Sequence, residues 1–323
     1  MKPFYFIFLA LLVSCGGGSG SGDSNNEMQG QTNPSQPDKS ENCISYGINS
    51  QKCSLIHNNL ERYYIIYRPT SSTPEDNLPV LFALHGYGST AETHKSYTQY
   101  EPLAENNRFI VVYPQGYKLE TQLTNSSSHW NSGAWTIGSN IDDVSFISTL
   151  IEIVASKINI DRSRVYSSGM SNGGFMSYHL ACNLSSKIAA VASVTGSMSK
   201  ETYEDCNPAH PTSILQVHGT IDATVPFDGN SALGMRSIND VMDYWNLYNA
   251  CDVDPTSIIT DYFDIEIAVQ HDTYSNCLND VHVELYKIEG MGHRWPNKGR
   301  YGISATEIIW EFINTYDING RMD

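Results

Sequence analysis

From residue 54 onward the chain alternates short apolar runs with helical stretches, and this alternation constrains the fold more than any other feature. The runs Pro79–Leu84 and Phe109–Tyr113 are almost wholly apolar, as expected of strands that are buried on both faces. Asp142 precedes a stretch whose apolar residues recur at helical spacing, and its acidic start suits a helix N-terminus. Strands that alternate with helices predict the α/β class, with a mainly parallel central sheet flanked by helices in a single domain.

The same criteria place the other elements. Further strands are expected at Ser54–His57, Tyr63–Arg68, Arg164–Ser168, Ala189–Val194, Ile214–Val217 and Val281–Ile288. Further helices are expected at Tyr97–Asn106, Asn172–Cys182, Ile238–Tyr248 and Ala305–Thr315.

Length and charge exclude several classes of protein. The 323 residues include 19 Lys and Arg against 35 Asp and Glu, which gives a formal net charge of -16. A surface this acidic repels phosphate backbones and argues against nucleic acid as a partner. After the first residues no apolar run approaches the roughly 18 residues that a membrane-spanning helix needs, so a polytopic membrane protein is not expected.

Residues 1–15 resemble the signal peptide of an exported lipoprotein. Lys2 supplies a positive start, and Phe4–Val13 is an apolar segment too short to span a bilayer. The segment ends in Leu-Val-Ser-Cys, which matches a bacterial lipobox, so we expect Cys15 to carry lipid and to hold the protein on a membrane in the periplasm or at the cell surface. An ordinary secretory signal is the alternative. Residues 16–42 are polar and rich in Gly and Ser, which predicts a flexible tether before a catalytic domain at residues 43–323.

The remaining cysteines are even in number, which suggests disulfides in an exported protein. Many connectivities are open to them. Pairing each with its nearest neighbour gives Cys43–Cys53, Cys182–Cys206 and Cys251–Cys277. No C-x-x-C or H-x-x-x-H spacing occurs, so no metal site is expected.

One sequence motif predicts a catalytic nucleophile. Gly169-Met170-Ser171-Asn172-Gly173 is a G-x-S-x-G that follows an expected strand and precedes an expected helix. That context is the one a nucleophile elbow requires, in which glycines permit a tight turn that lifts the serine hydroxyl above the sheet. We therefore expect Ser171 to be the nucleophile of an α/β-hydrolase fold.

A serine nucleophile needs a base that a third group orients. In this fold the partners follow in the order acid, then histidine, each on a loop after a later strand. His293 follows the last strand in a glycine-rich segment and is the expected base, in preference to His218 at a strand end and His271 in a polar loop. Asp222 is the first carboxylate after the preceding strand and is the expected acid, with Asp228 as the alternative.

The developing oxyanion needs backbone N–H donors. We expect one from Asn172, directly after the serine, and one from Tyr87 in the segment His85-Gly86-Tyr87-Gly88. His85 comes too early in the chain to be the base and is expected to buttress this turn. Trp295 is close in sequence to the expected base and is expected to contact substrate. No cofactor is expected.

Five sequence segments, in this order along the chain, support a resemblance to a known family: LHGYG (84–88), DDVSFI (142–147), RVYSSGMSNGGFMSYHLAC (164–182), HGTIDATVP (218–226) and GMGHRWP (290–296). Over roughly residues 50–318 the sequence resembles the secreted feruloyl esterase and poly(3-hydroxybutyrate) depolymerase-like α/β-hydrolases of carbohydrate esterase family 1. The resemblance implies Ser171 as nucleophile, Asp222 as acid and His293 as base. It also implies disulfides like Cys182–Cys206 and Cys251–Cys277.

The resemblance also guides the expected substrate. Some polyester depolymerases of this group carry Cys where this chain has Tyr87. Polymer-degrading members often append a separate binding module, which is not expected after the last helix here. Both departures argue against a solid polyester and favour soluble esters or side-chain esters on polysaccharides. Hydroxycinnamoyl esters on plant polysaccharide are the expected substrates, with acetyl esters on xylan and 3-hydroxybutyrate esters as alternatives. A serine peptidase and a non-catalytic polysaccharide-binding lipoprotein are the rival classes.

Overall fold

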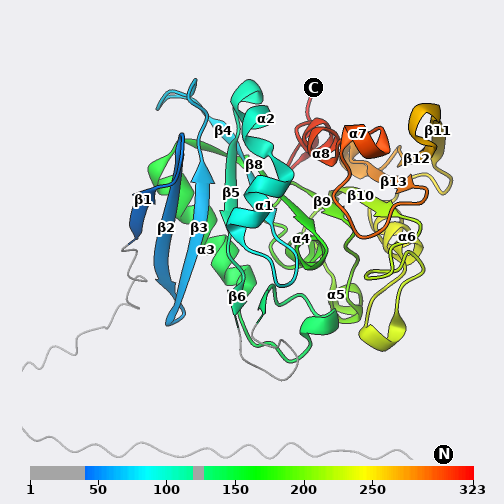
Figure 1. Ribbon diagram of the computed structural model, residues 1–323, viewed down its shortest axis with the longest axis horizontal. Coiled ribbons are helices and arrows are strands. Elements are labelled where there is room, and N and C mark those ends of the chain that lie inside the picture. Colours follow the sequence, from blue (N-terminus) through cyan, green and yellow to red (C-terminus); the bar gives the residue numbers. More distant parts are fainter. Residues whose placement is uncertain (1–40, 119–126) are drawn as a thin grey trace, which may run out of the picture. The chain divides into compact units, whose positions relative to one another are not determined.

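A computed structural model describes residues 41–118 and 127–323 (Figure 1). The expected signal peptide, the expected lipidation site Cys15 and residues 16–40 of the expected tether lie outside the described residues. Residues 37–323 form one compact unit, and its first strand begins at Asn42, next to the expected start of the domain. No helix in the described ranges is both long enough and apolar enough to cross a membrane.

An 11-stranded sheet forms the centre of the domain, in the order β1-β2-β3-β5-β4-β8-β9-β10-β13-β12-β11. Its strands are β1 (Asn42–Ser45), β2 (Ser50–His57), β3 (Leu60–Tyr67), β4 (Leu78–Leu84), β5 (Ile110–Pro114), β8 (Ile160–Met170), β9 (Ala190–Val194), β10 (Ser213–Gly219), β11 (Thr256–Tyr262), β12 (Ile267–Tyr274) and β13 (Val283–Ile288). The central strands from β5 to β13 are parallel, and antiparallel strands extend both edges. The pairs β6 (Tyr117–Lys118) with β7 (Ser128–His129) and β14 (Tyr316–Asp317) with β15 (Gly320–Arg321) form separate small sheets.

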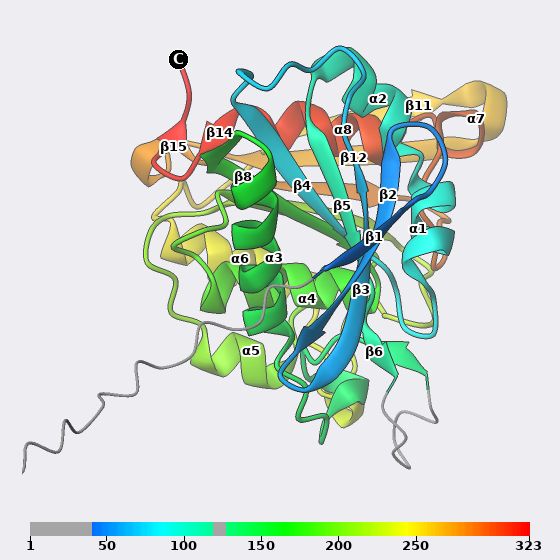
Figure 2. The same cartoon turned by 90° about the vertical axis from the view of Figure 1, so that its left-hand side faces the viewer.

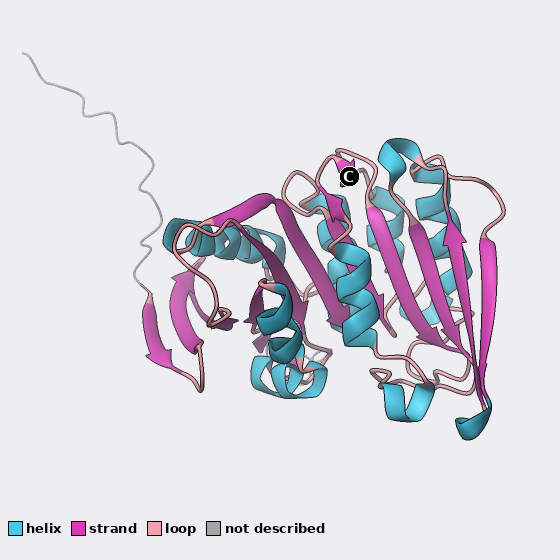
Figure 3. Ribbon diagram, turned by 90° about the horizontal axis from the view of Figure 1, so that it is seen from above, coloured by secondary structure: helices cyan, strands magenta, loops and turns pink. Residues whose placement is uncertain are grey.

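Helices cover both faces of the sheet (Figures 2 and 3). They are α1 (Ala91–Thr98), α2 (Tyr100–Asn107), α3 (Asp143–Lys157), α4 (Asn172–Asn183), α5 (Lys200–Asp205), α6 (Ile238–Tyr248), α7 (Lys298–Tyr301) and α8 (Ala305–Ile313), with 3-10 turns at Ala134–Thr136, Ser231–Leu233, Phe263–Ile265 and Leu278–Asp280. Figure 2 shows α3, α4 and α6 on one side of the strands and α1 and α2 on the other.

The two largest hydrophobic clusters among the described residues lie one on each face of the sheet. Along β4, Val80 and Phe82 belong to the core beneath α3, α4 and α6, while Leu81 and Ala83 belong to the core beneath α1, α2 and α8. This alternation follows from the period of two in a strand, and it explains why β4 is apolar throughout. The predicted α/β architecture with a mainly parallel centre is therefore confirmed.

The helix expected at Tyr97–Asn106 is instead two helices, which is a correction. Gln99 is left-handed, with φ 52° and ψ 45°, and separates α1 from α2. Pro102 explains the break, because proline has no N–H to donate and clashes with the preceding turn inside a continuous helix. In the first turn of a new helix that N–H is not needed.

The hairpin of β11 and β12 was not expected from the sequence. The prediction that His271 lies in a polar loop is wrong. This residue lies on β12, opposite Tyr286 of β13. Its ring stacks on that of Tyr286 with centroids 4.0 Å apart, and its Nε2 lies 2.8 Å from a carboxylate oxygen of Glu284. β11 is exposed along almost all of its length, so it lacks the apolar alternation that reveals a strand in a sequence.

The structure contains the disulfides that nearest-neighbour pairing predicts. Cys43–Cys53 joins β1 to β2, where the two residues are direct partners in the sheet. Cys182–Cys206 links the end of α4 to the residue after α5, and Cys251–Cys277 links the segments that follow α6 and β12. Each bridge closes a short loop, so the native connectivity is largely local.

Candidate active site

Ser171 occupies a sharp turn between β8 and α4. Its backbone has φ 55° and ψ -122°, a region that a residue with a side chain rarely adopts. The Ser171 amide donates to the carbonyl of Val194 at the end of β9, and the Ser171 carbonyl accepts from Gly174 and Phe175 in the first turn of α4. The turn is thus fixed by the neighbouring strand and by the helix, as in the nucleophile elbow that the sequence predicts.

The glycines around Ser171 are required by close packing. A Cβ on Gly169 would lie 2.2 Å from the backbone of Gly173, and a Cβ on Gly173 would lie 2.1 Å from the carbonyl oxygen of Leu84. Real Cβ atoms do not approach other atoms so closely, so helix α4 can begin directly against β4 only with glycine at these positions. The serine is held at the carboxyl edge of the parallel strands.

Asp222 and His293 meet at the same edge of the sheet. Asp222 follows β10 and His293 follows β13, and these two strands are parallel neighbours. Nδ1 of His293 donates to Oδ2 of Asp222 over 2.8 Å. The two loops also hold each other, because the Ile221 amide donates to the carbonyl of Met291. The histidine side chain is 22% exposed and that of Asp222 is fully buried, so the ring is reachable while its anchor is not.

The surroundings of Asp222 favour its charged form. Burial raises the pKa of this carboxyl, but hydrogen bonds from His293 and from the amides of Val225 and Thr224 outweigh burial and hold the pKa below its ordinary value. The alternative acid, Asp228, is exposed and lines a separate hollow beside α5 and α6. The structure therefore pairs His293 with Asp222, the carboxylate preferred in the sequence analysis.

His218 is buried and structural. Its Nε2 donates to the carbonyl of Val225 over 2.8 Å, and Nε2 of Gln216 donates to its Nδ1 over 2.9 Å. Burial lowers the pKa of His218 to about 4, so the ring is neutral near neutral pH. With both nitrogens engaged, this ring has none left to accept a proton from a serine.

The loop after β4 lies directly beside Ser171. A Cβ on Gly86 would lie 3.4 Å from the Cβ of Ser171. Nδ1 of the buried His85 donates to the carbonyl of Gly86 over 2.8 Å, while the Gly116 amide donates to its Nε2 over 2.9 Å. Burial lowers the pKa of His85 to about 4. The neutral ring thus buttresses the turn that carries the half-buried Tyr87, as expected.

Asn172 contributes to the site through its position and its side chain. As the first residue of α4, it has an amide N–H without an intrahelical acceptor. Its buried side chain accepts from the amide of Trp130 over 2.7 Å and donates to the Trp130 carbonyl and to the hydroxyl of Ser132. The indole N–H of Trp130 donates in turn to the carbonyl of His85, so one residue links both expected oxyanion segments.

Trp295 does not lie where a substrate-contacting residue would. Its side chain belongs to the hydrophobic core and the residue is only 5% exposed. The indole N–H donates to Thr306, and the ring packs edge-on against His94 and Tyr100. Proximity in sequence to His293 suggested a contact with substrate, but the tryptophan instead packs into the core, where its indole N–H donates to Thr306.

A buried charge at the start of α3 was not expected from the sequence. Asp142 caps α3, since its side chain accepts from the Ser145 amide, as its position predicts. Asp143, assigned only to the helix start, instead forms an ion pair with Arg62 of β3 over 2.7 Å. Arg62 directly precedes the expected strand Tyr63–Arg68 and follows Glu61, so no local pattern distinguished it from an ordinary charged residue at a strand end.

One group of three potential metal-ligating residues occurs among the described residues: Glu41, Cys43 and Cys53. Cys43 and Cys53 are joined in a disulfide, so neither offers a thiolate. This group is therefore not suited to bind a metal.

A family model described as "Esterase PHB depolymerase" matches residues 62–228, just over half of the chain. The chain belongs to this family. The matched region contains most of β3, the loop after β4, the Ser171 turn and Asp222, whereas His293 lies beyond it. Membership in the esterase PHB depolymerase family confirms the resemblance drawn from the sequence motifs.

Relatives of this esterase PHB depolymerase family member bear the names of ester hydrolases. The chain is 28% identical over 257 residues to a bifunctional acetylxylan esterase/xylanase of Neocallimastix patriciarum, covering 79% of this chain and 33% of that protein. It is 27% identical over 269 residues to feruloyl esterase B of Piromyces equi, covering 80% of this chain and 46% of that protein. The chain thus spans less than half the length of either relative.

The fold of this family member is shared with solved structures. An acetyl xylan esterase from Aspergillus awamori superimposes with a TM-score of 0.58 at 16% identity, over 81% of this chain and 98% of that one. At this identity the likeness shows the fold alone, and it confirms the predicted α/β-hydrolase architecture.

Proposed function

We propose that the protein is a serine esterase that works through a covalent acyl-enzyme, with Ser171 as nucleophile, His293 as general base and Asp222 as the acid that orients it. The observation that carries this proposal is the 2.8 Å hydrogen bond from His293 Nδ1 to Asp222 Oδ2 at the edge of the sheet that also carries the Ser171 turn. The names of the relatives support hydrolysis of carboxylic esters.

In the proposed mechanism each group has a distinct role. Asp222 holds the proton on Nδ1 of His293, so Nε2 is the nitrogen that accepts the proton of the Ser171 hydroxyl as the serine attacks the ester carbonyl. The amides of Tyr87 and Asn172 stabilise the oxyanion, and removing one such donor costs about 3 kcal/mol of transition-state stabilisation in serine hydrolases. His293 then protonates the leaving alcohol, and water attacks the acyl-enzyme by the same route in reverse.

Hydroxycinnamoyl esters on plant polysaccharide are the proposed substrates, because one of the two relatives described above is named a feruloyl esterase. Acetyl esters on xylan are the second candidate, since the other relative is named an acetylxylan esterase/xylanase. Esters of 3-hydroxybutyrate are the third, because the family description includes depolymerases of that polyester.

The proposed location is outside the cytoplasm. Disulfides form and persist in oxidising compartments, and the structure contains three. Lipidation of Cys15 would hold the enzyme on a membrane, and mass spectrometry of the purified mature protein tests it: a diacylglycerol-modified Cys15 at the N-terminus is the expected result.

The deciding experiment compares rates on methyl ferulate, acetylated xylan and a 3-hydroxybutyrate oligomer. We expect the highest kcat/KM on methyl ferulate, and a loss of about 10^4-fold or more in Ser171→Ala because the nucleophile is removed. Ser177→Ala is the matched control, since this buried serine of α4 donates only within the protein core, to the carbonyl of Gly173.

The possible results of this comparison distinguish the candidate substrates, the proposed mechanism and a peptidase activity. A preference for acetylated xylan or for the oligomer, lost in Ser171→Ala, would keep the mechanism and change the substrate. Equal rates for the wild type and Ser171→Ala on all three esters would contradict the proposed mechanism. Cleavage of peptide amides faster than of esters would identify a peptidase instead.

A further inference from the structure

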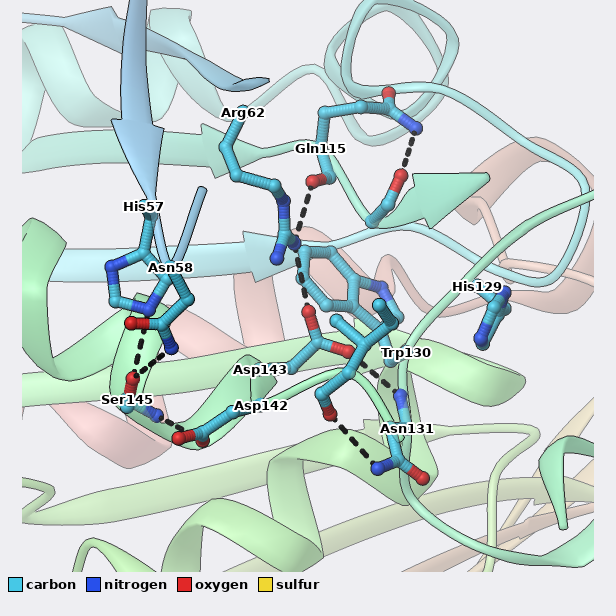
Figure 4. Close-up of polar contacts among 12 residues, drawn as sticks. His57, Asn58, Arg62, Gln115, His129, Trp130, Asn131, Asp142, Asp143 and Ser145 are labelled. Carbon is cyan, nitrogen blue, oxygen red and sulfur yellow. Dashed lines mark hydrogen bonds and ion pairs between the residues drawn. The ribbon is translucent and has the colours of Figure 1, made fainter. Parts of the chain in front are cut away.

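A buried ion pair lies behind the proposed oxyanion hole. Nη2 of Arg62 contacts Oδ1 of Asp143 over 2.7 Å, and the two side chains are 2% and 0% exposed. The guanidinium also lies over the ring of Phe146, 3.8 Å from its centroid. Figure 4 shows Arg62 and Asp143 pointing toward each other between β3 and the start of α3. An ion pair this deep has a high desolvation penalty and is seldom retained for stability alone.

One arm of contacts runs from Asp143 to Asn172. The second carboxylate oxygen of Asp143 accepts from the Asn131 amide over 2.8 Å, and the Asn131 side chain donates to the carbonyl of Ile141. The preceding residue, Trp130, exchanges hydrogen bonds with the side chain of Asn172 through both its amide and its carbonyl. The position of the segment 130–132, and through it that of Asn172, thus depends on the Asp143 carboxylate.

The other arm runs from Arg62 to the loop after β4. The same Nη2 donates to the carbonyl of Gln115 over 3.0 Å. The next residue, Gly116, donates its amide to His85, whose ring donates to the carbonyl of Gly86, next to Tyr87. The side chain of Gln115 accepts from the Ala91 amide and fixes the far end of this loop. Arg62 therefore holds the strand end against which the first oxyanion segment rests.

We propose that Arg62 and Asp143 are positioning residues that set the two amides of the oxyanion hole, those of Tyr87 and Asn172, at the spacing that the transition state requires. The inference rests on the proposed function. A single nitrogen of Arg62, Nη2, contacts both Asp143 and the carbonyl of Gln115. Removing the ion pair therefore frees the Asn172 segment and the loop after β4 at once. Because a displacement of about 1 Å can slow a reaction about 100-fold, the pair governs rate through geometry while it remains outside the reacting atoms.

Asp143→Asn tests the proposal, because it keeps the shape of the side chain and removes its charge. The readouts are kcat and KM on p-nitrophenyl acetate, the Kd of phenylboronic acid as a tetrahedral analogue, and labelling of Ser171 by a fluorophosphonate to count active sites. We expect kcat per labelled serine to fall about 10- to 100-fold and the Kd of the boronic acid to rise in parallel, while KM changes less than about 3-fold.

The double variant Arg62→Met/Asp143→Asn separates positioning from stability. It leaves no unpaired buried charge, so it recovers the Tm that the single variant loses, whereas kcat stays low because both arms are still released. Arg62→Lys is the conservative variant, since it keeps a positively charged donor at this position, and we expect it to retain more of the wild-type kcat than the double variant does. Ile151→Ala on the same helix α3 is the matched destabilised control: its buried side chain belongs to the core, and its loss lowers Tm with kcat per labelled serine unchanged.

Wild-type kcat per labelled serine in both Asp143→Asn and the double variant would overturn the proposal. Failure of both variants to give folded protein would also overturn it, because the pair would then serve folding. If fluorophosphonate does not label Ser171 in the wild type, the proposed function itself fails, and this outcome is distinct from failure of the inference.

Discussion

At the scale of single residues, the surroundings of two aspartates on one loop separate an anchored carboxylate from an exposed one. Asp222 accepts hydrogen bonds from two amides and from His293, whereas Asp228 is exposed to solvent. Because Asp222 is held by these hydrogen bonds, it can fix the orientation of the His293 imidazole, which an exposed carboxylate cannot. Position along the chain favoured Asp222 and left Asp228 as the alternative, and the structure pairs Asp222 with His293.

We expect Asp222→Asn to lower kcat by about 10^4-fold, because an amide cannot hold the proton on Nδ1 of His293 and favours the wrong tautomer. Asp228→Asn is the matched control and should keep kcat within about 2-fold of the wild type. Steady-state kinetics on methyl ferulate would measure both. Equal losses in the two variants would contradict the assignment of Asp222.

At the scale of elements, the junction of β4 and α4 determines where the nucleophile stands. The helix begins so close to the strand that only glycine fits at position 173. The same junction carries the Gly86 backbone next to Ser171, so its packing links stability to the geometry of the site.

We expect Gly173→Ala to lower the free energy of unfolding by about 2 kcal/mol or more, because its methyl group would overlap the Leu84 carbonyl and force the helix and strand apart. Gly299→Ala in α7 is the control: its nearest neighbour would be 3.7 Å away, and alanine favours a helix by about 1 kcal/mol over glycine. Urea denaturation measures both. If Gly173→Ala were as stable as Gly299→Ala, the close approach of α4 to β4 would be wrong.

At the scale of the whole molecule, buried histidines make stability depend on pH. Burial lowers the pKa of His85 to about 4, of His218 to about 4 and of His94 to about 3. Unfolded histidines titrate near pH 6.5, so between about pH 6.5 and pH 4 the unfolded chain binds more protons than the folded one. Stability is therefore full above about pH 6.5 and falls as the pH drops toward 4, by about 1 kcal/mol per pH unit for each histidine.

His94→Phe tests this dependence. Nε2 of His94 has no hydrogen-bond partner among the described residues, and its ring packs against Tyr113 and Trp295, so phenylalanine should fit. We expect an unchanged Tm at pH 7.5 and a smaller decrease in Tm between pH 6.5 and 4.5 than in the wild type. Identical pH profiles for the two proteins would contradict the burial of a neutral His94.

The sequence by itself determined what depends on near neighbours in the chain. Apolar runs predicted the central strands, Asp142 predicted the start of α3, and the glycines around Ser171 predicted a turn that the structure contains. Each of these features follows from the local conformation and burial of a short segment, which periodicity and residue type report directly. The order of the segments was enough to place Asp222 and His293 on loops at the same edge of the sheet, because parallel strands end at one edge. That β10 and β13 are direct neighbours is seen only in the structure.

The tertiary structure alone decided which distant residues meet. Arg62 and Asp143 belong to separate elements and pair only because β3 and α3 pack together, and no local pattern marks a partner so far along the chain. The inward turn of Trp295 and the polar hairpin of β11 and β12 are set in the same way, by packing against neighbouring elements. The chemistry of a side chain determines whether it favours burial. Which neighbours satisfy its hydrogen bonds and charge is determined by how the elements pack in three dimensions.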